Sequence, residues 1–576
     1  MKKIILCLCL IMLPLQFAIA NDRIGDFALL DHNGTFHQLS YYDDMQAVVV
    51  LVHAVQCEAL QQSVSGFKVA QAAFEPRGVE FMLLNAEGST REILRREADR
   101  LGLNMPILMD DAQLVSESLG VRHAGEVLVL DPLTFSIVFR GPVGAGLTAA
   151  INQVLAGEPV LEAELTGTGC AIQYAARDQH RQSGISYVSD VAPIIAKNCA
   201  ECHRQNSIAP FALDSHQMVQ GWSPMIREVV MTKRMPPGQV DPHVGNVIGM
   251  SNLSNADQQT LIHWIDAGAL KDGETDPLAA LVWPDSKWRS EPGTEPDLIV
   301  KIPPQQIPAT GVIEYLNIVV DIPLQEDVWI RGSEIVPGDY SVLHHVITRI
   351  VAPDENGDDV VTEESDDEFV GQDKTDVPLA RLSGYVPGRR PSLTPNGGGL
   401  LRKGSAARFQ LHYTTSGREV LDESELGIYF YPQGVVPEIE KRSGGRALNA
   451  RFEIPAFAKD YEVVQSAFVE KDAYLLSFMP HMHFRGKRMK FVAKLPDGTE
   501  QEILSVPHYQ FNWQVRHQIE PMFVPAGTEI VAIGAFDNSA QNQFNPDPSQ
   551  DIDWGPQSWD EMFIGYMRWQ HVEDMK

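Results

Sequence analysis

Three short fragments in the second half of the chain hold histidines that could ligate metal ions. They read Val-Leu-His-His-Val, Gln-Leu-His-Tyr and Met-Pro-His-Met-His, and a later Asp-Glu-Met adds a thioether. Imidazole suits copper and zinc alike, and a thioether beside it favours Cu(I). Taken singly, each histidine is more simply a half-buried strand residue. The candidate ligands are His344, His345, His412, His481, His483 and Met562.

The spacing inside two of these fragments predicts different backbones. His481 and His483 lie two residues apart, so in a β-strand both side chains reach the same face and can share one ion. His344 and His345 are adjacent and would face opposite ways unless a bulge or a strand end re-aims one of them. We therefore expect irregular backbone at His344–His345. The alternative is that the histidines are core residues or bind one adventitious zinc ion.

A separate motif, Cys199-Ala-Glu-Cys202-His203, is the attachment pattern for c-type haem, in which two thiols form thioethers and the imidazole ligates iron. A redox C-x-x-C or half a zinc site are the alternatives. Met235, which follows a predicted helix in Lys-Arg-Met-Pro-Pro-Gly, is the candidate sixth ligand, because a thioether raises the reduction potential. A buried core methionine is the competing role for Met235. The competing ligands are His216, His243 and His263.

Two further cysteines, Cys57 and Cys170, are redox thiol candidates. Cys57 follows a predicted strand and begins a helix, where the helix N-terminus lowers a thiol pKa. Leu60 stands where a C-x-x-C motif that starts at Cys57 would place its second cysteine. A conventional dithiol cycle is therefore not expected. Cys170 could pair with Cys57, since export favours oxidation. An unpaired structural Cys57 and a peroxide-reactive thiol stay open, because sequence alone does not fix connectivity.

The N-terminus and the charge of the chain bound its location and partners. Residues 1–20 combine two lysines, an apolar run and a small-x-small ending, which is the pattern of a cleaved export signal, with a retained anchor as the alternative. Lys and Arg number 46 against 76 Asp and Glu, and the net charge of -30 repels phosphate backbones and anionic lipids. We expect a periplasmic or secreted protein that binds no nucleic acid and is not stably inserted in a membrane after signal cleavage.

At 576 residues the chain is predicted to hold three or four domains. Residues 21–165 alternate apolar strand-like runs, at 47–52, 79–84 and 126–130, with a helical stretch at 92–103. That alternation predicts an α/β domain with a mixed sheet.

Residues 185–275 are predicted to form a small all-α unit. Helix starts are expected at Ser189–Asp190, Ser223–Pro224 and Ser254–Asp257. A linker covers 271–308, and short alternating runs separated by turns then continue to the C-terminus, as in β-sandwiches. The acidic stretches Asp354–Asp359 and Glu363–Glu368 are expected to be a solvated loop, with a cation site as the alternative.

The β region resembles the copper type II, ascorbate-dependent monooxygenases, which include peptidylglycine hydroxylating and dopamine β-monooxygenases. The resemblance covers about 295–576 and includes Phe-Asn-Trp-Gln at Phe511–Gln514 besides the histidine fragments and Asp-Glu-Met. It implies two all-β, jelly-roll-like sandwich domains, at 295–440 and 445–576. It also implies an electron-storing copper held by His344, His345 and His412, and an oxygen-binding copper held by His481, His483 and Met562. Tyr413 and Asn512 are further candidates near the coppers. Unlike the animal enzymes, this region has no cysteine.

Two more resemblances cover the rest of the chain. Residues 185–275 resemble a monohaem cytochrome c domain, which implies one covalently attached haem c. Residues 21–165 resemble the thioredoxin-like redoxins, although Ala54 stands where peroxiredoxins place an activating threonine.

Together these patterns indicate an exported, copper-dependent monooxygenase-like oxidoreductase that hydroxylates an organic or peptide substrate with O2. Its electrons would come from ascorbate or a periplasmic protein donor, and the haem would relay them to the three-histidine copper. One alternative is a non-catalytic haem and copper electron-transfer or copper-binding protein. The other is a thiol-disulfide or peroxide redox sensor.

Overall fold

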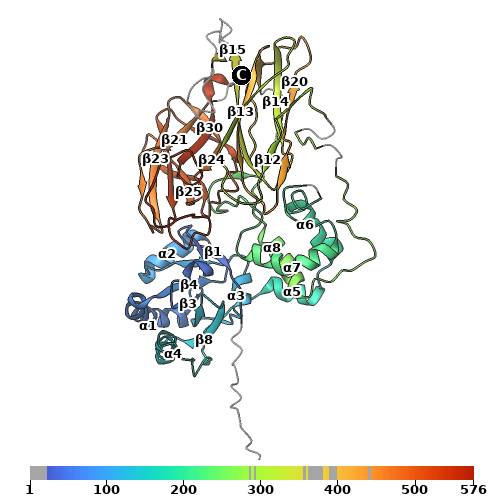
Figure 1. The fold of residues 1–576 in the computed structure, drawn as a ribbon. Helices are drawn as coiled ribbons and strands as arrows, with labels where there is room; N and C mark the ends of the chain where they lie inside the picture. Colours follow the sequence, from blue (N-terminus) through green and yellow to red (C-terminus); the bar gives the residue numbers. More distant parts are fainter. Residues whose placement is uncertain are drawn as a thin grey trace, which may run out of the picture. The chain divides into compact units, whose positions relative to one another are not determined.

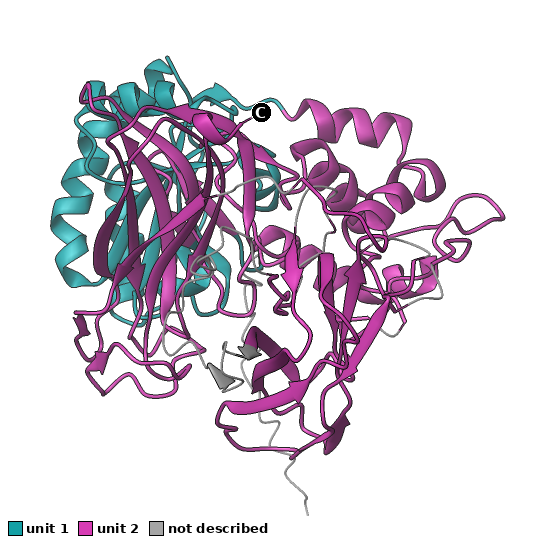
Figure 2. Cartoon of the chain, turned by 90° about the horizontal axis from the view of Figure 1, so that it is seen from above, with its two compact units in different colours: residues 1–27, 38–173 teal, residues 28–37, 174–576 magenta. Residues whose placement is uncertain are grey.

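The computed structural model describes residues 23–205, 207–283, 287–290, 294–353, 359–360, 380–387, 393, 398–438 and 443–575. The predicted export signal and nearly all of the two predicted acidic stretches lie outside these ranges. The chain divides into two compact units, 1–27 with 38–173 and 28–37 with 174–576 (Figure 2). Among the described helices, none combines the length and the apolar character that crossing a membrane requires.

The N-terminal part is built on a mixed β-sheet in the order β2-β1-β5-β4-β3-β7-β8. The strands β3, β4 and β5 run parallel, and β7 pairs antiparallel with β3. Every residue of β3 is buried, which explains the unbroken apolar run over its first six residues, Ala47–Val52. The strands are β1 (Ala28–Asp31), β2 (Phe36–Gln38), β3 (Ala47–His53), β4 (Val79–Asn85), β5 (Ile107–Met109), β7 (Glu126–Asp131) and β8 (Ser136–Pro142). The helices are α1 (Glu58–Phe74), α2 (Arg91–Leu101), α3 (Leu114–Ser118) and α4 (Ala145–Leu155). The predicted α/β domain with a mixed sheet is confirmed.

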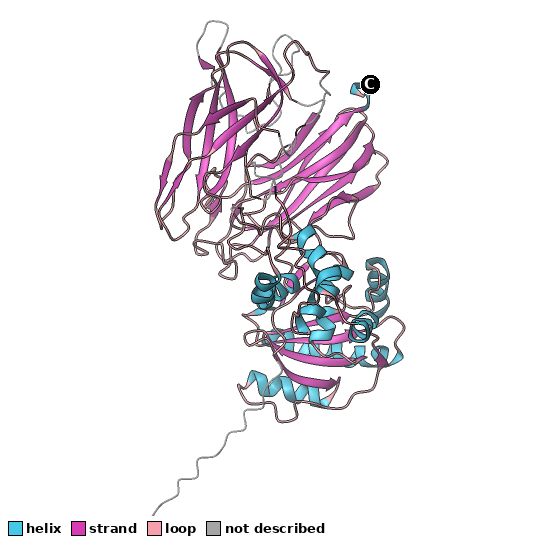
Figure 3. Cartoon of the chain, turned by 90° about the vertical axis from the view of Figure 1, so that its right-hand side faces the viewer, coloured by secondary structure: helices cyan, strands magenta, loops and turns pink. Residues whose placement is uncertain are grey.

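A helical segment follows, with α5 (Ala175–Ser183), α6 (Ala192–Asn198), α7 (His216–Met231) and α8 (Asn255–Asp266) (Figure 3). The helix start predicted at Ser254–Asp257 is confirmed, because the Ser254 hydroxyl accepts from the Asp257 amide at 3.1 Å. The start predicted at Ser223–Pro224 is wrong, since Pro224 lies inside α7 and Ser215 is the N-cap. The His216 amide donates to the Asp276 carboxylate at 2.7 Å, and this contact fixes the earlier start.

The start predicted at Ser189–Asp190 is also displaced. A π-helical turn over Tyr187–Val191 precedes α6, and its N-cap is Ser186. The Ser186 hydroxyl accepts from the Ser189 amide at 3.0 Å, and the Asp190 carboxylate accepts from the Ser186 amide at 2.8 Å. The Ser186 side chain thus caps the backbone of Ser189 and the Asp190 side chain caps the backbone of Ser186, so the helix begins three residues earlier than predicted.

The next part of the chain is all β (Figure 1). Its two sheets share one hydrophobic core. The sheets have the orders β11-β20-β14-β17 and β13-β18-β15-β16, and β12 pairs with β19. Since β11 and β12 fall within 271–308, the predicted linker is wrong over its last third. The strands are β11 (Leu298–Lys301), β12 (Gln305–Ile307), β13 (Leu316–Asp321), β14 (Val328–Val336), β15 (Leu343–Pro353), β16 (Asp359–Val360), β17 (Gly399–Leu401), β18 (Ala406–Tyr413), β19 (Val420–Asp422) and β20 (Glu425–Phe430).

The C-terminal part repeats this layout around a second core. Its sheets have the orders β10-β27-β24-β30-β21 and β23-β28-β25-β26, and β22 pairs with β29. The strand β10 (Val247–Ile248) lies within 185–275 and pairs with β27, so the prediction that this unit is all-α is wrong at this strand. The others are β21 (Ser443–Asn449), β22 (Glu453–Ile454), β23 (Tyr461–Val469), β24 (Ala473–His481), β25 (Gly486–Lys494), β26 (Glu500–Val506), β27 (His517–Val524), β28 (Thr528–Phe536), β29 (Ile552–Asp553) and β30 (Phe563–His571).

Candidate metal centres

The neighbouring strands β15 and β18 bring three predicted ligands together. His345 lies directly opposite His412 in the antiparallel register, and the register shifts between Leu343 and His345. That irregularity is the bulge expected from two adjacent histidines, and it re-aims His344 toward the same side. The ligand nitrogens of the three histidines lie within 4.8 Å of one another, and all three residues are buried.

The three imidazole rings bring their Nδ1 atoms close together. His344 Nδ1 and His412 Nδ1 each lie 3.3 Å from His345 Nδ1. His344 Nε2 lies 2.9 Å from Asn512 Oδ1, which can only accept, so Nε2 carries the proton and Nδ1 keeps its lone pair. Nitrogens about 3.3 Å apart are compatible with one ion bound tetrahedrally at roughly 2.0–2.1 Å.

Burial keeps these imidazoles neutral, which is the form that binds a metal ion. Loss of solvation lowers the pKa of His344 to about 4 and that of His412 to about 3. The pKa of His345 is lowered well below its usual value by burial and then by its histidine neighbours. Protons therefore compete poorly for this cluster at neutral pH.

His481 and His483 form a second pair at the end of β24. Their ring centroids are 5.4 Å apart. His481 Nδ1 lies 2.8 Å from Gln514 Oε1, and His483 Nδ1 lies 3.2 Å from the carbonyl oxygen of Asp560. Because both partners are acceptors, both Nδ1 atoms are protonated and the Nε2 atoms keep the lone pairs. Burial, with His481 nearby, lowers the pKa of His483 to about 3.

Met562 precedes β30, the strand that pairs with β24. His481 lies opposite Ile564 in that register. The buried Glu561 carboxylate accepts from the His483 amide at 2.8 Å and from the Arg485 amide at 2.6 Å. The backbone at Met562 is thus held beside His483, and its thioether as a ligand stays a prediction.

A single short segment, Phe511–Gln514, contacts both histidine groups. Phe511 stacks on His344 with centroids 4.6 Å apart and an 11° interplanar angle, and its ring lies 6.0 Å from that of His483. Asn512 bonds to the first group and Gln514 to the second. The motif is recognisable in the sequence, but the roles of Phe511 and Gln514 are not, since only the folded chain brings these side chains to the histidines.

Two tyrosines lie close to the first group, one in space and one in the sequence. The Tyr315 ring lies 4.7 Å from that of His412 and 5.4 Å from that of His345, and nothing in the sequence pointed to it. Tyr413 follows His412, but its buried hydroxyl donates to Asp422 at 2.8 Å. Tyr413 therefore belongs to the core hydrogen bonding of this domain, and Tyr315 belongs to the site.

Replacing Asn512 with alanine is expected to weaken copper binding at the three-histidine group about 10–100-fold, because the amide that fixes the tautomer of His344 is lost. Competition against a calibrated copper chelator measures this affinity. Gln514→Ala is the matched control, and it should weaken the His481/His483 site instead. Equal effects of both variants on one site would contradict the separate roles of Asn512 and Gln514.

The Cys-x-x-Cys-His motif lies directly after α6. Neither Cys199 nor Cys202 is in a disulfide. Burial raises the pKa of Cys199 to about 12, which is unfavourable for a redox thiolate. His203 Nδ1 donates to the carbonyl oxygen of Phe211 at 3.1 Å, leaving Nε2 as the ligand nitrogen.

The candidates for a sixth ligand have different surroundings. His216 Nε2 donates to the carbonyl oxygen of Ala269 at 2.9 Å, and His263 Nδ1 lies 2.8 Å from His180 Nδ1. His243 is exposed. Met235 is half-buried in the loop after α7 and stays a prediction as a ligand.

The other two cysteines of the described residues, Cys57 and Cys170, form a disulfide with Cα atoms 6.0 Å apart. Cys57 is the buried N-cap of α1. Cys170 is exposed and belongs to β9 (Cys170–Ala171), which pairs with β6 (His123–Ala124). Of the three possibilities for Cys57, namely a disulfide with Cys170, an unpaired structural thiol and a peroxide-reactive thiol, the structure contains the disulfide.

Comparison with known proteins bears on this first part of the chain. Residues 20–143 match the AhpC/TSA family. This match supports a redoxin domain in the first part of the chain. No curated protein matches the chain.

Similar solved structures cover about a quarter of this chain. They include a hypothetical protein from Sinorhizobium meliloti 1021, at 23% identity over 27% of this chain and 93% of that one, with a TM-score of 0.25. Peroxidoxin BcpB from Mycobacterium tuberculosis is 18% identical over 24% and 93%, with a TM-score of 0.21. The thioredoxin domain of a thiol-disulfide oxidoreductase from Bacteroides vulgatus is 15% identical over 24% and 99%, with a TM-score of 0.22.

Removing the disulfide of the redoxin domain by Cys170→Ser is expected to lower its free energy of unfolding by about 2–4 kcal/mol, because a cross-link closing so long a loop restricts the unfolded chain. The thermal midpoint of this domain, measured with and without a thiol reductant, tests the effect. Reductant should lower the midpoint of the native protein to that of the variant and leave the variant unchanged. Equal midpoints for the oxidised native protein and the variant would contradict this stabilisation.

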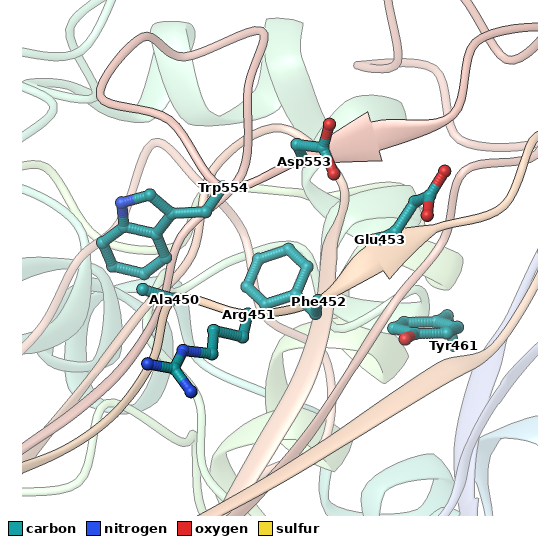
Figure 4. A pocket seen from close by; sticks show the side chains of 7 residues that line it. All are labelled: Ala450, Arg451, Phe452, Glu453, Tyr461, Asp553 and Trp554. Carbon is teal, nitrogen blue, oxygen red and sulfur yellow. The ribbon is translucent and has the colours of Figure 1, made fainter.

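An open hollow of about 650 Å³ lies elsewhere in the C-terminal β part (Figure 4). None of the candidate metal ligands lines it, so we assign it no role in the metal centres. Its lining residues are Ala450, Arg451, Phe452, Glu453, Tyr461, Asp553 and Trp554.

Proposed function

We propose that this oxidoreductase-type chain is an exported, copper-dependent monooxygenase that hydroxylates an organic or peptide substrate with O2. The observation that carries the proposal is that one segment, Phe511–Gln514, contacts two groups of histidines from two different β-domains. Burial keeps members of both groups neutral, so each offers imidazole lone pairs at neutral pH.

The two groups would hold copper in different ways. His344, His345 and His412 offer three Nδ1 atoms, whereas His481 and His483 offer Nε2 atoms to which Met562 would add a soft sulfur. When bound, copper would supply one-electron redox chemistry at the first group and affinity for O2 at the second.

The surrounding residues orient the ligands and exclude water. Asn512 and Gln514 hold one ring of each group in a defined tautomer. Phe511 covers His344 with an apolar ring, and Glu561 anchors the backbone of His483. These contacts pre-organise both groups before any substrate arrives.

Electrons would reach the copper sites from ascorbate or a periplasmic protein donor. Cys199, Cys202 and His203, with Met235 as sixth ligand, would hold one haem c on the way to the three-histidine group. The His203 ring supports this assignment, because its Nδ1 is used by Phe211 and its Nε2 keeps the lone pair. Residues 1–20 would direct the chain to the periplasm or outside the cell, where it would bind no nucleic acid and, after signal cleavage, would not be stably inserted in a membrane.

Elemental analysis with EPR of the exported protein tests the proposal. We expect two copper ions and one haem iron per chain, with two cupric signals and one low-spin haem signal. Zinc in place of copper, or copper with no oxygen consumption on any organic substrate, would contradict it. Copper and haem without oxygen consumption would instead favour a non-catalytic electron carrier.

A second candidate function is a thiol-disulfide or peroxide reaction of the redoxin domain. It is favoured by the disulfide, because the Cys170 end is exposed while the Cys57 end caps a helix. Retention of oxygen consumption in Cys57→Ser would separate this reaction from the copper chemistry.

A further inference from the structure

We propose that Tyr340 and Tyr385 form the contact through which the Cys199–His203 motif passes electrons to the three-histidine group. This inference rests on the proposed function, because it needs a haem at the motif and a copper ion at the histidines. In each transfer the ferrous haem iron loses one electron and becomes ferric, and that electron reduces Cu(II) to Cu(I). No covalent bond forms or breaks.

The first part of the route leaves the haem motif through hydrogen bonds. The Ser207 hydroxyl donates to the carbonyl oxygen of Glu201, inside the motif, at 3.1 Å. Arg289 Nη2 donates to the Ser207 hydroxyl at 3.3 Å. The same guanidinium lies 5.8 Å from the centroid of the Tyr340 ring. The motif is thus linked to Tyr340 by two hydrogen bonds and one cation–π contact.

This link is fixed by a buried carboxylate. Glu334 on β14 is 3% exposed, and it accepts from the Arg289 amide at 2.9 Å and from the Ser290 amide at 3.0 Å. The Ser290 hydroxyl donates to it at 2.8 Å, and the Tyr429 hydroxyl at 3.3 Å. A buried carboxylate that accepts this many hydrogen bonds holds Arg289 and Ser290 in one position. The Arg289 side chain is therefore held in place beside the Tyr340 ring.

The second part of the route enters the histidine group. The rings of Tyr340 and Tyr385 have centroids 6.4 Å apart. Tyr385 is buried and exchanges both backbone hydrogen bonds with Val346, each at 2.9 Å. Gly384 permits this approach, since a Cβ there would lie 2.4 Å from the Val346 carbonyl oxygen. Val346 directly follows His345, so the last step runs through one peptide bond.

Another set of contacts leads from the helical segment to the other histidine pair. The loop after Met235 reaches Val515, because a Cβ on Gly238 would lie 2.8 Å from a Val515 methyl. Val515 follows Gln514, which bonds to His481. The rate of electron tunnelling through either set of contacts, the tyrosines or Val515, would depend on the covalent bonds and hydrogen bonds along it. We assign the transfer to the tyrosines because their route ends at the three-histidine group, where the proposed function stores electrons.

Photoreduction of the haem in the anaerobic, cupric holoprotein tests the route, with haem reoxidation followed by absorbance. We expect reoxidation to slow about tenfold or more in Tyr340→Leu, which corresponds to about 1.4 kcal/mol in activation free energy. Tyr385→Phe keeps the ring and should react within about twofold of the native rate. Val515→Ala is the control for the other contact, and it should leave the rate unchanged.

The outcomes separate the route from the proposed function. A Tyr340→Leu protein with native haem and cupric spectra but an unchanged rate would overturn the tyrosine route alone. A slower rate in Val515→Ala but not in Tyr340→Leu would also overturn it. A protein that binds no haem or no copper would overturn the proposed function together with the route.

Discussion

His481→Ala is expected to lower copper affinity at the His481/His483 site by more than about 100-fold, since loss of an outer partner alone costs about 10–100-fold. The three-histidine site should remain loaded, because Asn512 fixes His344 without help from His481. The copper content after dialysis against a chelator should therefore fall from two ions to one. Oxygen consumption with an accepted substrate should stop.

His243→Ala is the matched control for this substitution. His243 is exposed and belongs to no histidine group described above, so the variant should keep both coppers and full oxygen consumption. Two retained copper ions in His481→Ala would mean that His481 is not a ligand. Retained oxygen consumption with only one copper would assign the chemistry to the three-histidine group.

The local features of the site could be read from the sequence because they depend on neighbouring residues. Two adjacent histidines can face one side of a sheet only through irregular backbone, and the register does shift between Leu343 and His345. The fully buried strand β3 likewise shows as an unbroken apolar run. In these cases the physical cause acts within a few residues of chain.

Contacts between distant segments could not be read in the same way. Phe511 packs on His344 across 167 positions of sequence, which no periodicity encodes. The strand β11 looked like a linker because its partner β20 lies far along the chain. The start of α7 was misplaced because the bond from His216 to Asp276 outweighs the local signal at Pro224. Each of these was decided by tertiary structure.

The metal-free protein is expected to lose stability steeply as the pH falls from about 6.5 to about 4. The pKa values of His344, His412 and His483 are lowered to about 4, 3 and 3, and that of His345 also lies well below its usual value. Unfolded histidines titrate near 6.5, so in this window the unfolded chain binds more protons than the folded one. Protonation therefore favours unfolding, by about 3 kcal/mol for His344 alone.

The buried His508 and His517 strengthen this effect, and the Glu561 carboxyl opposes it. Burial lowers the pKa values of His508 and His517 to about 4, which acts in the same direction. Burial raises the pKa of Glu561 to about 8, so the folded state holds its proton more tightly and gains stability as the pH falls from 8 to about 4.5. Six histidines outweigh one carboxyl, and the net stability still falls with acid.

Thermal unfolding of the metal-free protein between pH 7.5 and 4.5 measures this dependence. The unfolding transition to follow is the one whose midpoint changes when copper is added. The midpoint should fall with pH, and His412→Gln should reduce the slope because one buried titrating ring is removed while its volume is nearly kept. Bound copper competes with protons for the same nitrogens, so loading should move the loss of stability to lower pH. A metal-free midpoint that stays constant from pH 7 to 5 would mean that the histidines are already solvated, and the buried, neutral ligand groups on which both copper sites depend would not exist.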